Sequence, residues 1–372
     1  MRITIATGIY PPDLGGPAKH AEAMKSFLES QRCKTSVVTF GPSRPGGVRG
    51  LSRAFPFGFR HGVYFLRCLF AALASDVVYA QDAAGVGLPA LLSAKLLRRK
   101  FVVRVGGDLA WERVNERAKN PVSLREFYAG RRYLWQAPIY YCVTKLVLSL
   151  ADAVIVPAVM LKEVYVRYYG IAPEKILHFP NPELIPEAPS QFADPEQDRL
   201  LFAGRFVAYK NLDLLLRAFD QARQKSGRGK LVLVGDGPER HRLLTLKDRL
   251  ASKEFIEIRF PISREDLTAL IRESGVCVGP ALTEFNPNFI LECLAVKKPV
   301  LISSENGLSV QLPNQWLFEA RDEKGLAQKL EQMLTPDYYR DAVEKFKKIA
   351  PAPAWRETAT GIFSVFSKLC GY

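Results

Sequence analysis

Short apolar runs rich in β-branched residues alternate with longer amphipathic stretches along this chain, and this alternation limits the possible folds more than any other feature. In the first half we expect strands at Ile3–Ala6, Ser36–Phe40, Val77–Tyr79, Phe101–Val105 and Ala153–Val156. We expect helices at Ala18–Ser30 and Leu88–Leu97, and a long helical stretch over residues 123–150 that is interrupted near Pro138. Continuous apolar strands between helices are typical of a parallel sheet covered on both faces.

A proline-rich stretch interrupts the alternation, because neither a helix nor a central strand tolerates Pro180, Pro182, Pro186, Pro189 and Pro195. The pattern then restarts, with strands expected at Arg199–Ala203, Lys230–Val234, Ile256–Phe260, Val276–Gly279 and Val300–Ile302. The expected intervening helices are Leu212–Gln224, Glu239–Leu250, Glu265–Arg272 and Pro287–Ala295. We therefore expect an α/β chain with one domain over 1–180, a linker over 181–198 and a second domain over 199–340. Residues 341–372 are expected to form a helical segment that possibly returns to the first domain.

Composition excludes several classes of protein. Hydrophobic residues make up 48% and charged residues 24% of the 372 residues, which excludes a disordered chain, a collagen-like fibre and a coiled coil. The apolar run Val63–Ala74 is too short to span a bilayer, and the N-terminus lacks the build of a signal peptide. Six scattered cysteines without a C-x-x-C pair and four dispersed histidines predict no metal centre, and they fit a cytoplasmic location.

The net charge of +14 is concentrated in the first half: residues 1–195 contain 25 lysines and arginines but only 15 aspartates and glutamates. Such a field attracts phosphates, anionic lipid head groups or nucleic acid, although a merely solvated surface would look the same.

An acidic motif, Glu284 to Glu292, follows one expected strand and opens the next helix. Asn286 is a favoured N-cap residue and Pro287 suits the first helical position. The free N–H groups of such a helix start bind phosphates or hydroxyls, and two carboxylates at this spacing can accept bonds from two sets of hydroxyls. The alternative is an ordinary capped helix with surface acids.

Three further loops follow expected strands. Arg205 and Lys210 lie in the first of them, after Gly204, and together they could neutralise a diphosphate or simply be solvated. The segment Gly235-Asp236-Gly237 borders a nucleotide or is only a turn. Near the N-terminus, Gly15 and Gly16 precede Pro17 and allow close backbone approach to a phosphate, unless this too is a plain turn.

In this order, the motifs resemble the family 4 (group 1) glycosyltransferases of GT-B fold. The matching residues are Tyr10-Pro11-Pro12 with Gly15-Gly16, Gly204-Arg205 with Lys210-Asn211, Val234-Gly235-Asp236-Gly237-Pro238, Glu284 with Glu292, and Lys298-Pro299-Val300. The resemblance is specific over 199–302 and looser in the first half. It implies two Rossmann-like domains that face each other across a cleft, the first for the acceptor and the second for a nucleotide-diphosphate sugar.

The resemblance also implies residue roles. Arg205 and Lys210 would bind the diphosphate as the leaving group, and Glu284 would hold hydroxyls of the transferred sugar. Asp108 would contact the sugar or the acceptor hydroxyl, although it could equally cap the next segment. The donor-binding set would be Gly15, Gly16, Asp236, Asn286, Asn288, Phe289 and Glu292, with Glu292 on the ribose and the Gly16 N–H on a phosphate.

By the same resemblance the anomeric configuration would be retained. No metal or other cofactor would be needed, and the chain contains no D-x-D pair for a metal. The donor sugar would be linked to UDP or GDP, and the enzyme would be a hexosyltransferase.

Two departures from the family pattern bear on activity. Asn286-Pro287 stands where the family has Phe-Gly, so one backbone donor is missing, and the side chain of Asn286 or Asn288 could take its place. Gly107 stands where many members have a histidine before Asp108. A catalytically impaired sugar-nucleotide-binding protein is therefore one alternative. A nucleic-acid-binding protein that exploits the +14 charge is another, but Glu284 and Glu292 would repel a phosphate backbone, so we expect no nucleic-acid partner.

Cations interleaved with aromatic residues over 113–145 and 49–67 suit the surface of an anionic membrane. We expect peripheral contact through aromatic residues that include Tyr64, Phe127, Tyr128, Tyr133 and Trp135. The acceptor would be a glycan or a lipid-linked molecule, as in a cell-surface polysaccharide pathway. An amphipathic helix packed on its own domain is the alternative.

Overall fold

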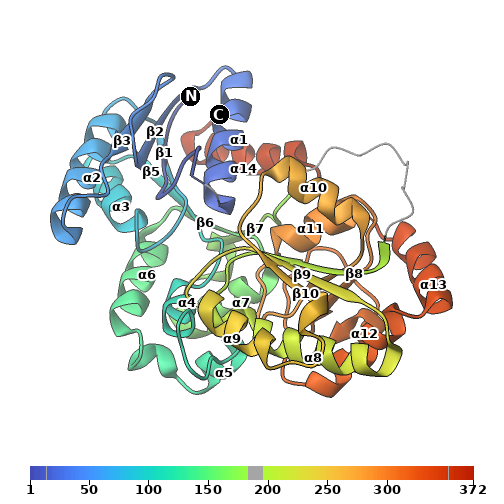
Figure 1. Cartoon of the computed structure of the whole chain (residues 1–372). Coiled ribbons are helices and arrows are strands. Elements are labelled where there is room, and N and C mark those ends of the chain that lie inside the picture. The colour runs from blue at the N-terminus through green and yellow to red at the C-terminus, as the bar shows by residue number, and fades with distance from the viewer. Residues whose placement is uncertain (14, 183–195, 351) are drawn as a thin grey trace. The chain divides into compact units, whose positions relative to one another are not determined.

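The computed structural model describes residues 1–13, 15–182, 196–350 and 352–372. The chain forms two compact units (Figure 1). The first comprises Met1–Ala110, Arg131–Pro180 and Ala354–Tyr372, and the second comprises Trp111–Gly130 and Asn181–Pro353. Most of the expected linker over 181–198 lies outside the described residues.

The first unit is built on a seven-stranded parallel sheet of order β3-β2-β1-β4-β5-β6-β7. Its strands are β1 (Arg2–Ala6), β2 (Lys34–Phe40), β3 (Val48–Leu51), β4 (Val77–Ala80), β5 (Lys100–Arg104), β6 (Ala153–Val156) and β7 (Ile176–His178). Its helices are α1 (Gly16–Ser30), α2 (Phe57–Ala72), α3 (Gly87–Leu96), α6 (Pro138–Leu150), α7 (Val159–Tyr169) and α14 (Trp355–Cys370). All four residues of β4 are buried, as a strand covered by helices on both faces requires.

The second unit has a six-stranded parallel sheet of order β10-β9-β8-β11-β12-β13. Its strands are β8 (Glu196–Ala203), β9 (Lys230–Val234), β10 (Ile256–Arg259), β11 (Ser274–Gly279), β12 (Val300–Ser303) and β13 (Leu317–Phe318). Its helices are α4 (Leu109–Asn115), α5 (Leu124–Ala129), α8 (Leu212–Ser226), α9 (Arg240–Asp248), α10 (Arg264–Glu273), α11 (Asn288–Ala295), α12 (Glu323–Met333) and α13 (Pro336–Lys347). The first two residues of α4 are counted with the first unit and the rest of the helix with the second.

In both sheets the strand order reverses beside the first strand, so each unit has the doubly wound topology of a Rossmann-like domain. The expected α/β class is therefore confirmed. Each sheet has its own apolar core, with Ile3, Ile5 and Val102 in the first unit and Leu200, Leu233 and Val278 in the second.

Two segments of the chain belong to a unit whose other residues lie far from them in the sequence. Helix α14 packs on α1 and β5, with Ile362 and Phe366 fully buried in the core of the first unit. The segment Trp111–Gly130 leaves the first unit and belongs to the second. Within the described residues, no helix is both long and apolar enough to cross a membrane.

Candidate functional site

The loops after β8, β9 and β11 hold most of the residues that the sequence singled out in the second unit. Carboxyl ends of parallel strands meet at one edge of a sheet, where ligands bind in open α/β folds. β8 is the neighbour of both β9 and β11, so the loop with Arg205 and Lys210 lies between the other two. The structure thus brings the expected cations and acids of this unit to one edge.

Arg205 forms the exposed side of this site. Its guanidinium lies 3.3 Å from a carboxylate oxygen of Glu116 and donates to the hydroxyl of Tyr209 over 2.6 Å. Burial, followed by the charge of Glu112, raises the pKa of Tyr209 well above its usual value, so its hydroxyl stays protonated. The side chain of Arg205 is 59% exposed, which leaves the guanidinium accessible to an anion.

Lys210 forms the inner side of the site. Its ammonium group lies 2.7 Å from Oε1 of Glu284, whose side chain is only 9% exposed. The backbone around Glu284 is fixed, because its N–H donates to the carbonyl of Glu305 and its carbonyl accepts from the N–H of Gly307. A buried carboxylate requires a partner of opposite charge, and Lys210 supplies it.

The turn from Glu284 into α11 differs from the sequence expectation by one residue. Pro287 is the N-cap, with an extended ψ of 123°, and α11 begins at Asn288, so the expectation that Asn286 caps the helix was wrong. Asn286 is buried in the left-handed region, with φ of 65°. Asn181 stabilises this turn, since its amide donates to the carbonyl of Asn286 over 2.9 Å and to Oδ1 of Asn288 over 3.2 Å.

Helix α11 carries the second acid of the motif. Glu292 is buried, and its Oε1 lies 4.0 Å from a guanidinium nitrogen of Arg264 on α10. Phe289, one turn earlier, packs against Phe202 of β8 with ring centroids 6.1 Å apart. This contact holds the helix against the strand that precedes Arg205.

The turn after β9 is tied to the loop after β8. Phe206 donates its N–H to the carbonyl of Asp236 over 2.8 Å, and the side chain of Asp236 is exposed. A Cβ atom on Gly235 would lie 1.9 Å from the carbonyl oxygen of Gly204, so only glycine permits this approach. The glycines therefore serve backbone packing between two loops of the site.

Sequence reasoning missed the contribution of the segment Trp111–Gly130. The N–H of Leu124 donates to the hydroxyl of Thr283 over 2.9 Å, and the N–H of Ala208 donates to the carbonyl of Glu116 over 3.0 Å. Trp111 packs on Tyr209 with ring centroids 4.8 Å apart. These contacts join residues far apart in sequence, and no local pattern indicated them.

The burial of several aromatic side chains corrects part of the expected membrane surface. Phe127, Tyr128 and Tyr133 are buried, as is Tyr64, whose hydroxyl donates to backbone carbonyls. Four of the aromatic side chains expected at a membrane therefore belong to protein cores. Trp135, by contrast, is exposed.

The remaining expected site residues belong to the first unit. Gly15 precedes α1, which begins at Gly16, and a Cβ atom on Gly15 would lie 2.8 Å from Cδ1 of Ile9. Asp108 is buried in the loop after β5. The roles of these three residues toward a donor or an acceptor stay predictions.

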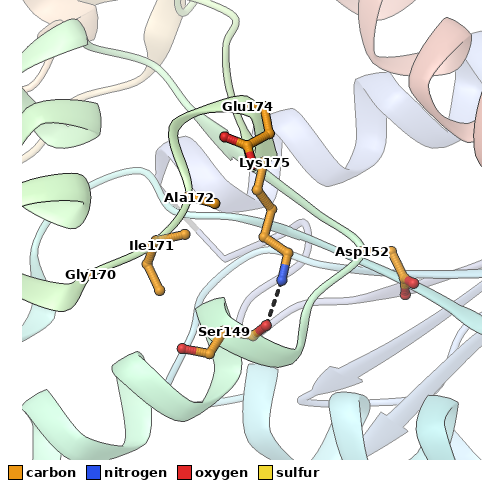
Figure 2. Close-up of a pocket in the computed structure, with 7 residues that line it drawn as sticks. All are labelled: Ser149, Asp152, Gly170, Ile171, Ala172, Glu174 and Lys175. Carbon is orange, nitrogen blue, oxygen red and sulfur yellow. Dashed lines mark hydrogen bonds between the residues drawn. The ribbon is translucent and has the colours of Figure 1, made fainter.

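A cavity of about 500 Å³ in the first unit is lined by none of the expected site residues (Figure 2). Figure 2 shows Lys175 extending toward Ser149, whose carbonyl accepts its hydrogen bond, with Asp152 at the side. Among the described residues, no group of three or more histidine, cysteine, aspartate or glutamate side chains is placed to hold a metal ion.

Family models match both halves of the chain. Residues 14–182 match the model for glycosyltransferase family 4, and residues 197–336 match the model for glycosyl transferases group 1. The α-D-kanosaminyltransferase of Streptomyces kanamyceticus is 26% identical over 110 residues, which are 30% of this chain and 28% of that protein. An uncharacterized glycosyltransferase of Bacillus subtilis is 29% identical over 152 residues, or 40% of each chain. The matched part thus spans well under half of these relatives.

Solved structures share the fold over nearly the whole chain. Sucrose-phosphate synthase from Thermosynechococcus elongatus has a TM-score of 0.73 at 16% identity, covering 99% of this chain and 98% of that one. HepE from Anabaena, in complex with UDP and glucose, has a TM-score of 0.74 at 15% identity, covering 98% and 99%.

Proposed function

This chain belongs to the group 1 glycosyltransferases with the GT-B fold, and we propose that it transfers a glycosyl group from a nucleotide-diphosphate sugar to an acceptor hydroxyl. The observation that carries the proposal is that one loop after β8 presents two cations, the exposed Arg205 and the inner Lys210, and that Lys210 pairs with the buried Glu284. A sugar-nucleotide donor is supported by the kanosaminyltransferase among the relatives and by the fold neighbour HepE, which was solved in complex with UDP and glucose.

The two cations would stabilise the leaving group. As the bond from the anomeric carbon to the diphosphate breaks, negative charge builds on the diphosphate, and fixed cations there lower the barrier. Arg205 provides a planar fork for two phosphate oxygens, and Lys210 provides a point charge. In this proposal the protein's own cations do the work that a metal ion does in other transferases.

The two acids would bind the neutral parts of the donor. Glu284, oriented by Lys210 and by its fixed backbone, would accept hydrogen bonds from hydroxyls of the transferred sugar. Glu292 would accept them from the ribose. We further propose that transfer retains the anomeric configuration, with a hexose moved to a glycan or lipid-linked acceptor.

A thermal-shift screen against UDP-, GDP- and ADP-sugars tests the proposal and identifies the base. We expect one nucleotide series to raise the unfolding temperature of the wild-type protein, and we expect this rise to be much smaller in Arg205→Ala. No shift with any of the three series would contradict a nucleotide-sugar donor. A full shift without turnover on any acceptor would favour the second candidate, a sugar-nucleotide-binding protein that Pro287 deprives of one backbone donor.

A further inference from the structure

Three neighbouring helices of the first unit expose large apolar side chains to solvent. Helix α2 packs on α3, and α3 packs on α6 (Figure 1). A surface helix normally directs its apolar stripe to the core and its polar stripe to water. These helices carry apolar residues on both sides, so their outer surface needs an explanation other than folding.

The outer stripe of α2 follows the helical repeat. Phe59, Leu66, Phe70 and the following Leu73 are each between 48% and 64% exposed, and their spacing of seven, four and three residues places them on one face. The opposite face buries Tyr64 completely. The exposed stripe is therefore additional to the stripe that holds the helix in the fold.

The other two helices continue this apolar surface. Leu92 and Leu96, one turn apart on α3, are exposed. On α6, Ile139 is 75% exposed, and Leu146 and Leu150 follow it at helical spacing. We call the outer surface formed by these side chains of α2, α3 and α6 the α2–α3–α6 face. Large exposed apolar side chains on three helices that pack against one another are typical of an interaction site.

The charge of this surface identifies the kind of partner. The segments 51–75, 83–103 and 127–151, which contain the three helices, hold ten lysines and arginines and no aspartate or glutamate. Arg98, Arg131 and Lys145 are exposed, and in the described part of the chain none of them forms an ion pair with a carboxylate. Lys95 does form one, with Asp152 at 2.9 Å, and Asp152 lies outside these segments.

We propose that the α2–α3–α6 face docks on the surface of an anionic lipid bilayer. Leucine, isoleucine and phenylalanine side chains would enter the boundary between head groups and acyl chains, while the cations would bind lipid phosphates. Each lysine or arginine that lies near an anionic surface without an acidic partner adds attraction, and among the described residues Arg98, Arg131 and Lys145 are such cations. A protein partner would have to be acidic and apolar at once, whereas an anionic bilayer offers both properties everywhere.

This surface overlaps in part with the segments 49–67 and 113–145 that the sequence suggested, since Phe59, Leu66 and Ile139 lie in them. It leaves out residues 113–130, which belong to the second unit and bury Phe127 and Tyr128. It is also independent of the proposed sugar transfer, since none of its residues is in the donor site.

Sedimentation with vesicles tests the proposal on the full-length protein. Vesicles of phosphatidylcholine are compared with vesicles that contain about 30% phosphatidylglycerol, at low salt and at about 0.5 M salt. We expect the protein to sediment with the anionic vesicles at low salt, and to stay largely in the supernatant with neutral vesicles or at high salt. Wild-type protein that stays in the supernatant with anionic vesicles at low salt would overturn the proposal.

Matched substitutions locate the binding face. Phe70→Glu and Ile139→Glu should weaken partitioning onto anionic vesicles by about tenfold or more, because a buried apolar contact becomes a repelled charge. Phe260→Glu is the control, since Phe260 lies in the second unit and is 62% exposed against 64% for Phe70. All three positions are exposed, and unchanged thermal unfolding would show that the variants fold.

Two results would assign the face otherwise. Equal partitioning of Phe70→Glu, Ile139→Glu and wild type would overturn the assignment of the face. A wild-type dimer that Phe70→Glu converts to a monomer, without vesicle binding, would show that a second copy of the chain covers the face.

Discussion

The ammonium group of Lys210 lies 2.7 Å from a carboxylate oxygen of Glu284, and this pair is largely buried at the carboxyl edge of the second sheet. Its neighbour Arg205 is paired as well, but with Glu116, over 3.3 Å and in contact with solvent. The two cations of the loop therefore differ in how firmly they are held. An incoming diphosphate would compete with Glu116 for an accessible guanidinium, and it would find Lys210 already positioned.

Replacing Lys210 with methionine should reduce turnover by about 10²–10³-fold, the usual loss when one preorganised donor to a developing charge is removed. The side chain keeps its length, and the charge is lost. Initial rates with the donor identified by thermal shift provide the measurement. Lys253→Met is the matched control, because Lys253 is exposed in the turn before β10 and far along the chain from the site loops. Normal turnover of Lys210→Met would contradict the leaving-group role.

Replacing Glu116 with glutamine should strengthen donor binding several-fold at low salt. The carboxylate competes with the diphosphate for Arg205, and an amide competes less because it has no charge. Calorimetric titration of wild type and variant with the nucleoside diphosphate gives the ratio of dissociation constants. Glu126→Gln serves as the control, since Glu126 pairs with the exposed Arg321 instead. Weaker binding by Glu116→Gln would mean that Glu116 orients Arg205 rather than competes for it.

Glu292→Ala should mainly weaken donor binding and leave the fold intact. The carboxylate is buried on α11 with a guanidinium nitrogen of Arg264 at 4.0 Å, and its removal deletes the proposed contact with the ribose. We expect the dissociation constant for the donor to rise by about tenfold or more, the effect of losing a charged hydrogen-bond acceptor. Unchanged affinity for the nucleotide would exclude a ribose contact by Glu292.

The two parallel sheets could be predicted from the sequence because each central strand is a continuous buried run, as in Leu231–Val234. Edge strands β3, β7 and β13 were missed, since they have only two to four residues and weak apolar patterns. The loop cations and acids could be found from turn residues after strands. The placement of Glu116 beside Arg205 could not be predicted. The segment that carries Glu116 is held by hydrogen bonds from the backbone N–H groups of Leu124 and Arg125 to side chains more than 150 residues away, those of Thr283 and Glu305.

The N-terminus of α11 shows a second limit of local reading. Proline suits either the N-cap or the first helical position, and the sequence alone does not distinguish them. Asn181, which lies at the start of the proline-rich stretch and more than 100 residues from the turn, contacts Asn286 and Asn288 and stabilises the geometry of the turn.

Replacing Gly235 with alanine should destabilise the second unit. The new Cβ atom would meet the carbonyl oxygen of Gly204 at 1.9 Å, and a backbone atom cannot move aside without disturbing β8. We expect the unfolding temperature to fall by about 5 °C or more, equivalent to about 2 kcal/mol for a unit of this size. Gly62→Ala on α2, where nothing lies within 4 Å of the new atom, should instead stabilise slightly. Equal melting of Gly235→Ala and wild type would show that the two loops do not need this close approach.

Lys298 makes the stability of the second unit depend on pH in the alkaline range. Its side chain follows α11 and is 2% exposed, and burial lowers the pKa to about 8, while contacts with Cys277 and Cys293 offset this only in part. Below about pH 8 both the folded and the unfolded chain bind the proton, so folding bears the full cost of burying a cation. Between about pH 8 and about 10.4, the unfolded chain binds the proton and the folded chain does not, so the free energy of unfolding rises with pH.

Lys298→Met removes this cost and tests the sign of the effect. At pH 7 the variant should be more stable than wild type by about 1–2 kcal/mol, and this advantage should shrink as the pH rises through 8 toward 10. Denaturant unfolding at pH 7, 8.5 and 9.5 gives the difference at each pH. The exposed Lys253→Met should show no such trend. An advantage that stays constant over this range would mean that the ammonium group of Lys298 keeps its proton in the folded protein.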